Sequence, residues 1–292
     1  MTPRARPLPA LIAALALIAA ALLGAACGGD GDDSADTESS VSLSDCTPEQ
    51  LETLKQGTLT VATDKPAFPP YFEDDDPTNG RGFESAVAYA IAEALSFKSS
   101  DVEWVVEPFN SSYAPGPKDF DFDVNQISIT PKRAEQVDFS STYYTANQAL
   151  VAAKGSDASK ATSLEDLSDT TIGVQIGTTS LDAVEQEIDP STEPRVFNDS
   201  NDVVTALKQG QVDAVVVDLP TALFLTAVQV PDGKIVGQFE APGGDQWGAL
   251  LEQDSPLTGC VSAAIDELRS SGELDAIEQK WMSEAAGAPK LD

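Results

Sequence analysis

The chain has 292 residues, 41% of them hydrophobic, which is enough to build one large domain or two of ordinary size. It carries 48 acidic against 17 basic side chains, and a net charge of −31 argues against nucleic acid as a partner. It contains no histidine, which excludes Ser-His-Asp and Cys-His catalysis together with histidine-ligated zinc.

The N-terminus has the pattern of a targeting segment. Arg4 and Arg6 precede an apolar run over residues 8–23, which falls short of the roughly 20 apolar residues that a membrane span needs. The run ends in Gly-Ala-Ala-Cys, which resembles the lipobox of a bacterial lipoprotein, cleaved before Cys27. We therefore expect residues 1–26 to be a lipoprotein signal peptide and Cys27 to carry a lipid, with an ordinary secretory signal or a spanning helix as the alternatives.

Residues 27–45 are small, acidic and almost free of apolar side chains, so we expect a disordered tether. These acids, like those at residues 73–76, lack the ligand spacing of a calcium loop, and no metal site is expected. Cys46 and Cys260 remain in an exported chain, where thiols tend to pair, and we expect a disulfide between them. The alternative is two separately buried thiols.

The first half of the chain alternates helix and strand signals. A capping-box pattern over residues 47–50 predicts a short helix, and residues 58–63 predict a strand that leads to Asp64. A stiff aromatic loop containing Phe68 follows, then helical spacing over residues 85–95. Residues 102–106 predict the next strand, and residues 109–118 an irregular loop.

The central stretch, residues 120–144, joins a strand to a short helix. Thr130 is a ready N-cap and Pro131 suits the first helical position, which places Arg133 in the first turn. Helix-start N–H groups are unpaired and attract anions, and the fork of an arginine fits a carboxylate with two bonds. The alternative is a surface arginine paired with Asp138.

The second half presents two more polar strand ends. A strand over residues 171–176 runs into Gly-Thr-Thr-Ser, which offers hydroxyls and free N–H groups to an anion unless Thr179 or Ser180 merely caps the next helix. A buried strand over residues 212–217 ends in Asp218, at the edge where open α/β sheets bind ligands. Asp218 could instead cap the helix that follows.

The runs S-I-T-P-x-R, V-D-F-S and Y-Y in the central stretch resemble the signature of bacterial extracellular solute-binding protein family 3, the amino-acid-binding subunits of ABC importers. The G-T-T corner, the strand before Asp218, and the T-D, aromatic-Pro-Pro-aromatic and G-F-acid runs are similar to the family as well. The resemblance implies an α/β fold of the two-lobed Venus-flytrap type (periplasmic binding protein-like II). Residues 46–146 and 245–292 would form lobe 1, and residues 147–244 lobe 2, joined by two crossing strands.

The resemblance also implies how the site binds an amino acid. Arg133 with the Thr178 and Thr179 corner would hold the carboxylate, while Asp218, Ser128 and carbonyls near Gln126 would hold the ammonium. Asp64 and Phe68 would line the pocket. The expected ligand-binding residues are thus Asp64, Phe68, Gln126, Ser128, Arg133, Thr178, Thr179 and Asp218, with Glu84 and Asn125 as further candidates.

The implied function is a monomeric, lipid-anchored binding protein on the extracytoplasmic face of the cell membrane, which captures a polar amino acid and delivers it to ABC permease subunits. It needs no cofactor and is not an enzyme. One alternative is a cyclohexadienyl dehydratase on the same fold, with Glu84 or Asp64 as its general acid. Another is a lipoprotein that senses its ligand and reports to a partner.

Overall fold

The computed structural model describes residues 41–282 and 288–291. The expected signal peptide, the lipidation site Cys27 and most of the expected tether lie outside these residues. Within the described part, no helix is both long and apolar enough to cross a membrane. The C-terminal end of the expected tether, Leu43–Asp45, forms a single 3-10 turn.

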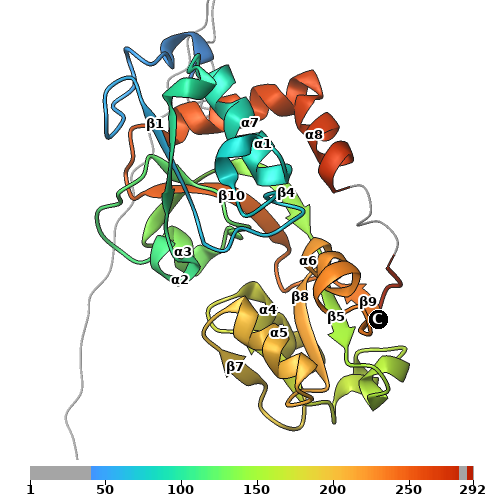
Figure 1. Cartoon of the computed structure of the whole chain (residues 1–292). Coiled ribbons are helices and arrows are strands. Elements are labelled where there is room, and N and C mark those ends of the chain that lie inside the picture. Colours follow the sequence, from blue (N-terminus) through green and yellow to red (C-terminus); the bar gives the residue numbers. More distant parts are fainter. Residues whose placement is uncertain (1–40, 283–287, 292) are drawn as a thin grey trace, which may run out of the picture. The chain divides into compact units, whose positions relative to one another are not determined.

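A mixed five-stranded sheet forms the first lobe, in the order β2-β1-β3-β10-β4 (Figure 1). Strands β1, β2 and β3 are parallel, and β10 is antiparallel to both β3 and β4. Polar and apolar residues do not alternate strictly along β1, because both faces of the strand are buried along its whole length. The strands span Leu59–Thr63 (β1), Val102–Val106 (β2), Phe122–Asp123 (β3), Val137–Ala146 (β4) and Asp245–Glu252 (β10).

Three long helices pack against this sheet through one apolar core that includes Phe83, Ile91 and Ile265. They are α1 (Phe83–Ala94), α7 (Thr258–Ser271) and α8 (Glu273–Trp281). A smaller core with Phe120 and Leu250 is packed against the short helix α2 (Phe109–Ser112). The remaining short helices are α3 (Pro131–Ala134), η2 (Pro77–Asn79) and η3 (Ser99–Asp101).

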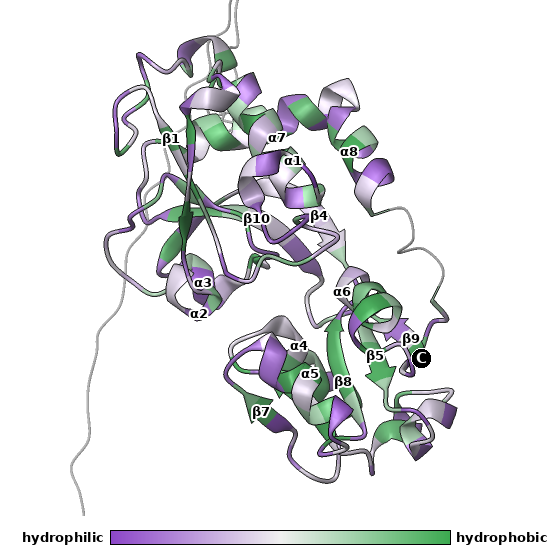
Figure 2. Cartoon of the chain, viewed as in Figure 1, coloured by the Kyte–Doolittle hydropathy of each residue, from purple (hydrophilic) through white to green (hydrophobic). Residues whose placement is uncertain are grey.

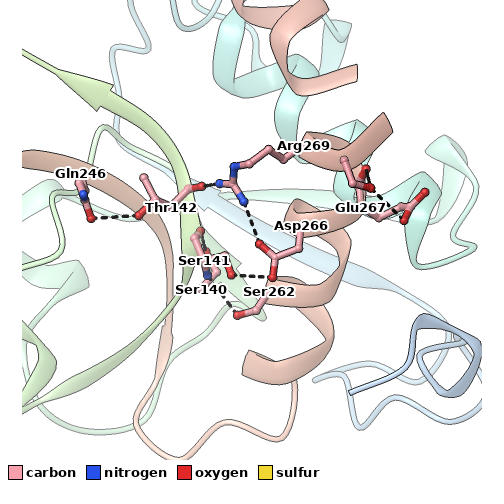
Figure 3. Close-up of polar contacts among 9 residues, drawn as sticks. Ser140, Ser141, Thr142, Gln246, Ser262, Asp266, Glu267 and Arg269 are labelled. Atoms are coloured by element: carbon pink, nitrogen blue, oxygen red, sulfur yellow. Dashed lines mark hydrogen bonds and ion pairs between the residues drawn. The ribbon is translucent and has the colours of Figure 1, made fainter. Parts of the chain in front are cut away.

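Polar contacts hold α7 onto strand β4 (Figure 3). Arg269 donates to the Thr142 carbonyl and to Asp266, 2.8 Å away, and Asp266 also accepts from the Ser141 hydroxyl at 3.1 Å. Thr142 in turn reaches Gln246 on β10 at 3.3 Å. These contacts fix the part of the first lobe from which the chain crosses to the second.

The second lobe is another mixed sheet, in the order β7-β6-β8-β5-β9. Alternate residues of β5 and β8 enter two different cores, Leu150 and Val216 one, Ala149 and Val215 the other. Both faces are thus covered, and Figure 2 shows these two strands as largely hydrophobic. The strands are β5 (Gln148–Ala152), β6 (Ile172–Gln175), β7 (Arg195–Phe197), β8 (Ala214–Asp218) and β9 (Lys234–Phe239).

The helices of the second lobe are short. Two of them, α4 and α6, pass directly into single π-helical turns, so each is shorter as an α-helix than its apolar spacing indicates. They are α4 (Thr179–Ala183), η6 (Val184–Ile188), α5 (Ser200–Lys208), α6 (Leu219–Phe224), η7 (Leu225–Gln229), η4 (Asp157–Lys160) and η5 (Glu165–Leu167).

The chain passes from the first sheet to the second at Asn147 and returns between β9 and β10. Two α/β lobes connected by two crossings confirm the fold expected from the resemblance.

Three expectations differ from the structure. Residues 47–50 form a single turn and no helix: the Gln50 and Leu51 N–H groups both donate to the Thr47 carbonyl, and no further helical bond follows them in this segment. Helix α2 occupies part of the loop expected at residues 109–118. The C-terminal residues, expected with lobe 1, pair with β9 in the second lobe: Gln238 N–H donates to the Pro289 carbonyl at 2.7 Å, and Leu291 is buried there.

The expected disulfide is confirmed. Cys46 and Cys260 are bonded with their Cα atoms 5.6 Å apart, which ties the segment before β1 to helix α7. The bond closes a loop with a sequence separation of 214 residues, and this loop contains both sheets. The chain-entropy estimate for so long a loop is a stabilisation of at most roughly 5 kcal/mol.

We expect the double variant Cys46→Ser with Cys260→Ser to lose several kcal/mol of unfolding free energy, because its denatured chain regains the freedom that the long loop removes. Urea denaturation of the oxidised wild type and the variant measures the difference. The reduced wild type, with both thiols blocked, serves as the control and should match the variant. Equal midpoints for oxidised wild type and variant would contradict the expectation.

Candidate functional site

A cavity of about 420 Å³ is lined by residues from both lobes. It gathers residues that are far apart in the sequence, at the ends of β1, β6 and β8 and around the start of α3. All eight residues expected to bind ligand line it, and so does Asn125: Asp64, Phe68, Asn125, Gln126, Ser128, Arg133, Thr178, Thr179 and Asp218. Glu84 does not.

Arg133 is held in place by the start of α3. The Thr130 side chain accepts from the Arg133 N–H, which confirms Thr130 as N-cap, and Pro131 occupies the first turn. Arg133 is 7% exposed, and its guanidinium donates to the Ser128 carbonyl at 2.7 Å and to the Gly177 carbonyl of the second lobe at 2.9 Å. Burial lowers its pKa.

Among the described residues, no carboxylate forms an ion pair with Arg133. The alternative partner, Asp138, accepts from the Thr258 hydroxyl at 2.8 Å instead. The remaining contacts of the guanidinium are aromatic, with its carbon 5.4 Å from the Phe109 ring centre and 4.8 Å from that of Tyr113. A buried cation with neutral partners can accept an anionic ligand.

The Gly-Thr-Thr corner forms the start of α4. Gly177 has φ +76°, and an added Cβ would lie 2.4 Å from the Tyr113 hydroxyl, so only glycine fits there. Thr178 is the N-cap, whereas the alternative reading of the sequence gave this role to Thr179 or Ser180, and its hydroxyl accepts from Leu181 N–H while donating to the Gln175 carbonyl. The Thr179 hydroxyl is free of capping and lies toward Asp245.

Asp218 ends β8 and precedes α6, but its side chain makes no capping bond to that helix. Its carboxylate accepts from Gln148 Nε2 at 2.7 Å. Burial raises the pKa of Asp218 well above its usual value, and the nearby carboxylate of Asp245 raises it further. The simple capping role is therefore absent, and this carboxylate lacks a cationic partner among the described residues.

Glu84, expected as a further ligand-contacting residue, lies behind Gln126. It is fully buried and accepts from the Gln126 backbone N–H at 2.6 Å, from the Gln126 amide and from the Tyr143 hydroxyl at 2.5 Å. Gln126 has φ +49°, an uncommon conformation for this residue type. Glu84 thus holds Gln126 in an orientation that the backbone alone disfavours.

Asp64 and Phe68 border the cavity from the first lobe. Both oxygens of Asp64 accept backbone N–H groups, from Lys65 at 2.6 Å and from Phe109 at 3.2 Å, which anchors the side chain at the end of β1. The Phe68 ring lies 6.1 Å from that of Phe224 in the second lobe. These residues form the wall that a ligand side chain would meet.

Several residues at the site were not anticipated from the sequence. Tyr71 contacts Thr221 at 2.8 Å between their hydroxyl oxygens, and Gln148 links Asp218 to Asp245. Phe109 lines the cavity under Arg133. Asp245 begins β10, where the acid within the turn Gly-Gly-Asp gives no sign that it will be buried beside Ser128 and Thr179.

The buried position of Glu84 raises its pKa from 4.5 to about 7. Between these values the folded protein holds a proton that the unfolded chain has released, so stability falls as pH rises from about 4.5 to 7. We expect Glu84→Gln to remove roughly 3 kcal/mol of this pH dependence. Denaturation at a series of pH values measures it.

The control is Glu93→Gln, an exposed position on the same helix, whose pH dependence should match the wild type. If wild type and Glu84→Gln show the same slope between pH 4.5 and 7, the assignment of a protonated Glu84 is wrong.

Comparisons with known proteins find chains that are similar in sequence and in fold. ArtP, the arginine-binding extracellular protein of Bacillus subtilis strain 168, is 30% identical over 73% of this chain and 82% of its own length. An ancestral arginine-binding protein solved with glutamine has a TM-score of 0.65 and 32% identity, covering 78% of this chain and 98% of that one. An ancestral amino-acid-binding protein, AncCDT-1, described as a precursor of cyclohexadienyl dehydratase, has a TM-score of 0.62 and 30% identity over 77% and 95% of the two chains.

The family model for bacterial extracellular solute-binding proteins, family 3, matches residues 59–284. This range contains both sheets and every residue that lines the cavity. The chain therefore belongs to the bacterial extracellular solute-binding proteins of family 3.

Proposed function

We propose that this protein binds a free amino acid in the cavity between its lobes and delivers it to the permease of an ABC importer. The observation that carries the proposal is that two groups of opposite charge, one from each lobe, line the same cavity. Arg133 is a buried cation from the first lobe that forms no ion pair with a carboxylate in residues 41–282 and 288–291, and Asp218 is a carboxylate from the second lobe that makes no capping bond to α6.

An amino-acid zwitterion complements these two groups. Leaving either charge of the ligand unpaired in a closed cavity would cost several kcal/mol, so each end needs an opposite charge. Micromolar binding requires about 8 kcal/mol, and charge-assisted hydrogen bonds contribute roughly 1.5–3 kcal/mol each. Arg133 and Asp218 with a few neutral donors and acceptors are sufficient.

The ligand also links the two lobes. Because Arg133 and Asp218 belong to different lobes, a bound zwitterion favours the arrangement in which both are near it. The permease would recognise this ligand-bound arrangement. The permease would thus respond to the relative position of the two lobes. The ligand would stay enclosed between them until it is transferred.

A polar or cationic side chain suits the rest of the cavity. With Arg133 and Asp218 assigned to the zwitterion, the carboxylate of Asp64 remains at the wall, beside the aromatic face of Phe68. Lys65 also lines the cavity, but its ammonium pairs with Asp75 at 3.3 Å. The relative named for arginine binding and the neighbour solved with glutamine are consistent with this class of ligand.

We propose binding without turnover. A dehydratase on this fold needs a general acid above the bound ring, and of the two candidates Glu84 is enclosed behind Gln126. The other, Asp64, already accepts two backbone N–H groups. Absence of any product from prephenate or arogenate, with saturable binding of an amino acid, is the expected result.

We further propose that the mature chain begins at Cys27 and is a monomer held at the extracytoplasmic face of the cell membrane by lipid on that residue. Support comes from the sequence before Cys27, which has a short apolar run and small residues. In the sequence, residues 28–45 lie between this anchor and the first lobe. A lipoprotein that senses its ligand has the same architecture, and permease and ATPase genes beside this one would favour import.

A thermal-shift screen against the twenty amino acids, ornithine, citrulline and polyamines tests the ligand class. We expect at least one polar or cationic amino acid to raise the melting temperature, because a ligand that binds only the folded state stabilises it. A chain that responds to none of these compounds contradicts the proposal.

We expect Arg133→Ala to weaken binding of the amino acid found in that screen by at least 100-fold, since the ligand carboxylate loses its charged partner. Calorimetric titration measures the change, and circular dichroism checks that the variant is folded. Lys132→Ala is the matched control, an exposed residue in the same turn of α3. Unchanged affinity in Arg133→Ala would refute the role of this residue.

A further inference from the structure

Asp245 is a buried carboxylate at the junction of the two lobes. It begins β10, where the chain returns to the first lobe, and it is completely buried. Its oxygens accept from three side chains: Ser128 of the first lobe, and Thr179 and Gln148 of the second. None of the ion pairs among the described residues includes Asp245.

These contacts determine where two hydroxyl protons point. A hydroxyl has one proton to donate and two lone pairs to accept with. The Ser128 proton is directed to Asp245 Oδ1, and the Thr179 proton to the same carboxylate, whose oxygens lie 3.0 and 3.2 Å from Thr179 Oγ1. The two hydroxyl oxygens are 3.3 Å apart, and both line the cavity.

We propose, building on the function proposed above, that Asp245 is a positioning residue that fixes the Ser128 and Thr179 hydroxyls as hydrogen-bond acceptors toward the cavity. These two hydroxyls therefore accept from the ammonium of the ligand and cannot donate to its carboxylate. This revises the expected role of the Thr179 hydroxyl, which the family resemblance assigned to the carboxylate. The carboxylate keeps Arg133 as its charged partner.

The groups around Asp245 support the same direction of hydrogen bonding. Gln148 donates its amide to both Asp218 and Asp245, and its carbonyl accepts the Ser180 hydroxyl at 2.7 Å, so Ser180 is committed as a donor inside the protein as well. Two carboxylates thus share one neutral amide. A ligand ammonium beside Asp218 supplies the positive charge that this cluster lacks.

The proposal gives Asp245 a part in ligand selection. An ammonium can donate to Asp218, Ser128 and Thr179 together, whereas a ligand without this group leaves three acceptors unpaired. Asn at position 245 would donate its amide to one hydroxyl, which could then turn its own proton into the cavity. The preference for an ammonium at this corner should then fall.

Calorimetric titration with matched probes tests the proposal. The probes are L-arginine, 5-guanidinopentanoate, which lacks the α-ammonium, and agmatine, which lacks the carboxylate; for a protein that binds glutamine in place of arginine they are L-glutamine, glutaramate and 4-aminobutanamide. In the wild type we expect loss of the ammonium to weaken binding at least 100-fold. In Asp245→Asn the loss of affinity on removing the ammonium should be at least tenfold smaller than in the wild type. The loss of affinity on removing the carboxylate should be unchanged.

Asp138→Asn is the matched control, because Asp138 also accepts a hydroxyl, that of Thr258, but Thr258 does not line the cavity as Ser128 and Thr179 do. Its losses of affinity should equal those of the wild type. Equal losses on removing the ammonium in wild type and Asp245→Asn overturn the role of Asp245 and leave the proposed function intact. A wild type that binds no amino acid overturns the proposed function, and the ligand-selection role with it.

A ligand-free measurement tests the underlying contact. In a double-mutant cycle of Asp245→Ala and Thr179→Val on chemical unfolding, we expect the effects on the unfolding equilibrium constant to be coupled by at least fivefold, since each change removes the same hydrogen bond. Additive effects would mean that Asp245 does not orient Thr179, and would overturn the proposal whatever the ligand.

Discussion

The site depends on a buried positive charge that no carboxylate of the described residues neutralises in an ion pair. The Arg133 guanidinium is supported by two carbonyl groups and two aromatic rings, which satisfy part of its hydrogen bonding and shield it from water. Burying a charge in this way is costly unless an opposite charge is supplied. A ligand carboxylate can supply it, and this requirement is why we propose the cavity as the binding site.

The opposite end of the cavity has the complementary arrangement. Asp218 and Asp245 are linked through the Gln148 amide, and the pKa of Asp218 is raised because burial and its neighbour both disfavour its charge. Among the described residues, no cationic side chain forms an ion pair with either of these two carboxylates. A zwitterion placed between the two ends would give Arg133 an anionic partner and Asp218 a cationic partner. Since the two ends belong to different lobes, ligand binding and the arrangement of the lobes would be coupled.

The sequence predicted those parts of the site that depend on local structure. Thr130 and Pro131 define a helix start by capping and by fixed φ, so the place of Arg133 could be inferred without a fold. Asp218 could be placed because an acid at the end of a buried parallel strand lies at a ligand-binding edge. The two lobes followed from the alternation of elements together with the family resemblance.

Residues whose role depends on contacts distant in sequence could not be assigned. Glu84 follows the family's glycine and phenylalanine and was expected near the ligand, but it lies behind Gln126, 42 residues away in the chain. Asp245 gave no signal because its partners, Ser128 and Thr179, are 117 and 66 residues away. The return of residues 288–291 to β9 likewise depends on a strand edge that no local pattern identifies.

The most direct test of the central claim is a crystal structure of the protein with the amino acid that binds most tightly. The account predicts the ligand carboxylate within hydrogen-bonding distance of the Arg133 guanidinium and its ammonium within hydrogen-bonding distance of Asp218. A ligand bound in the reverse orientation, or bound outside the cavity that these two residues line, would contradict it.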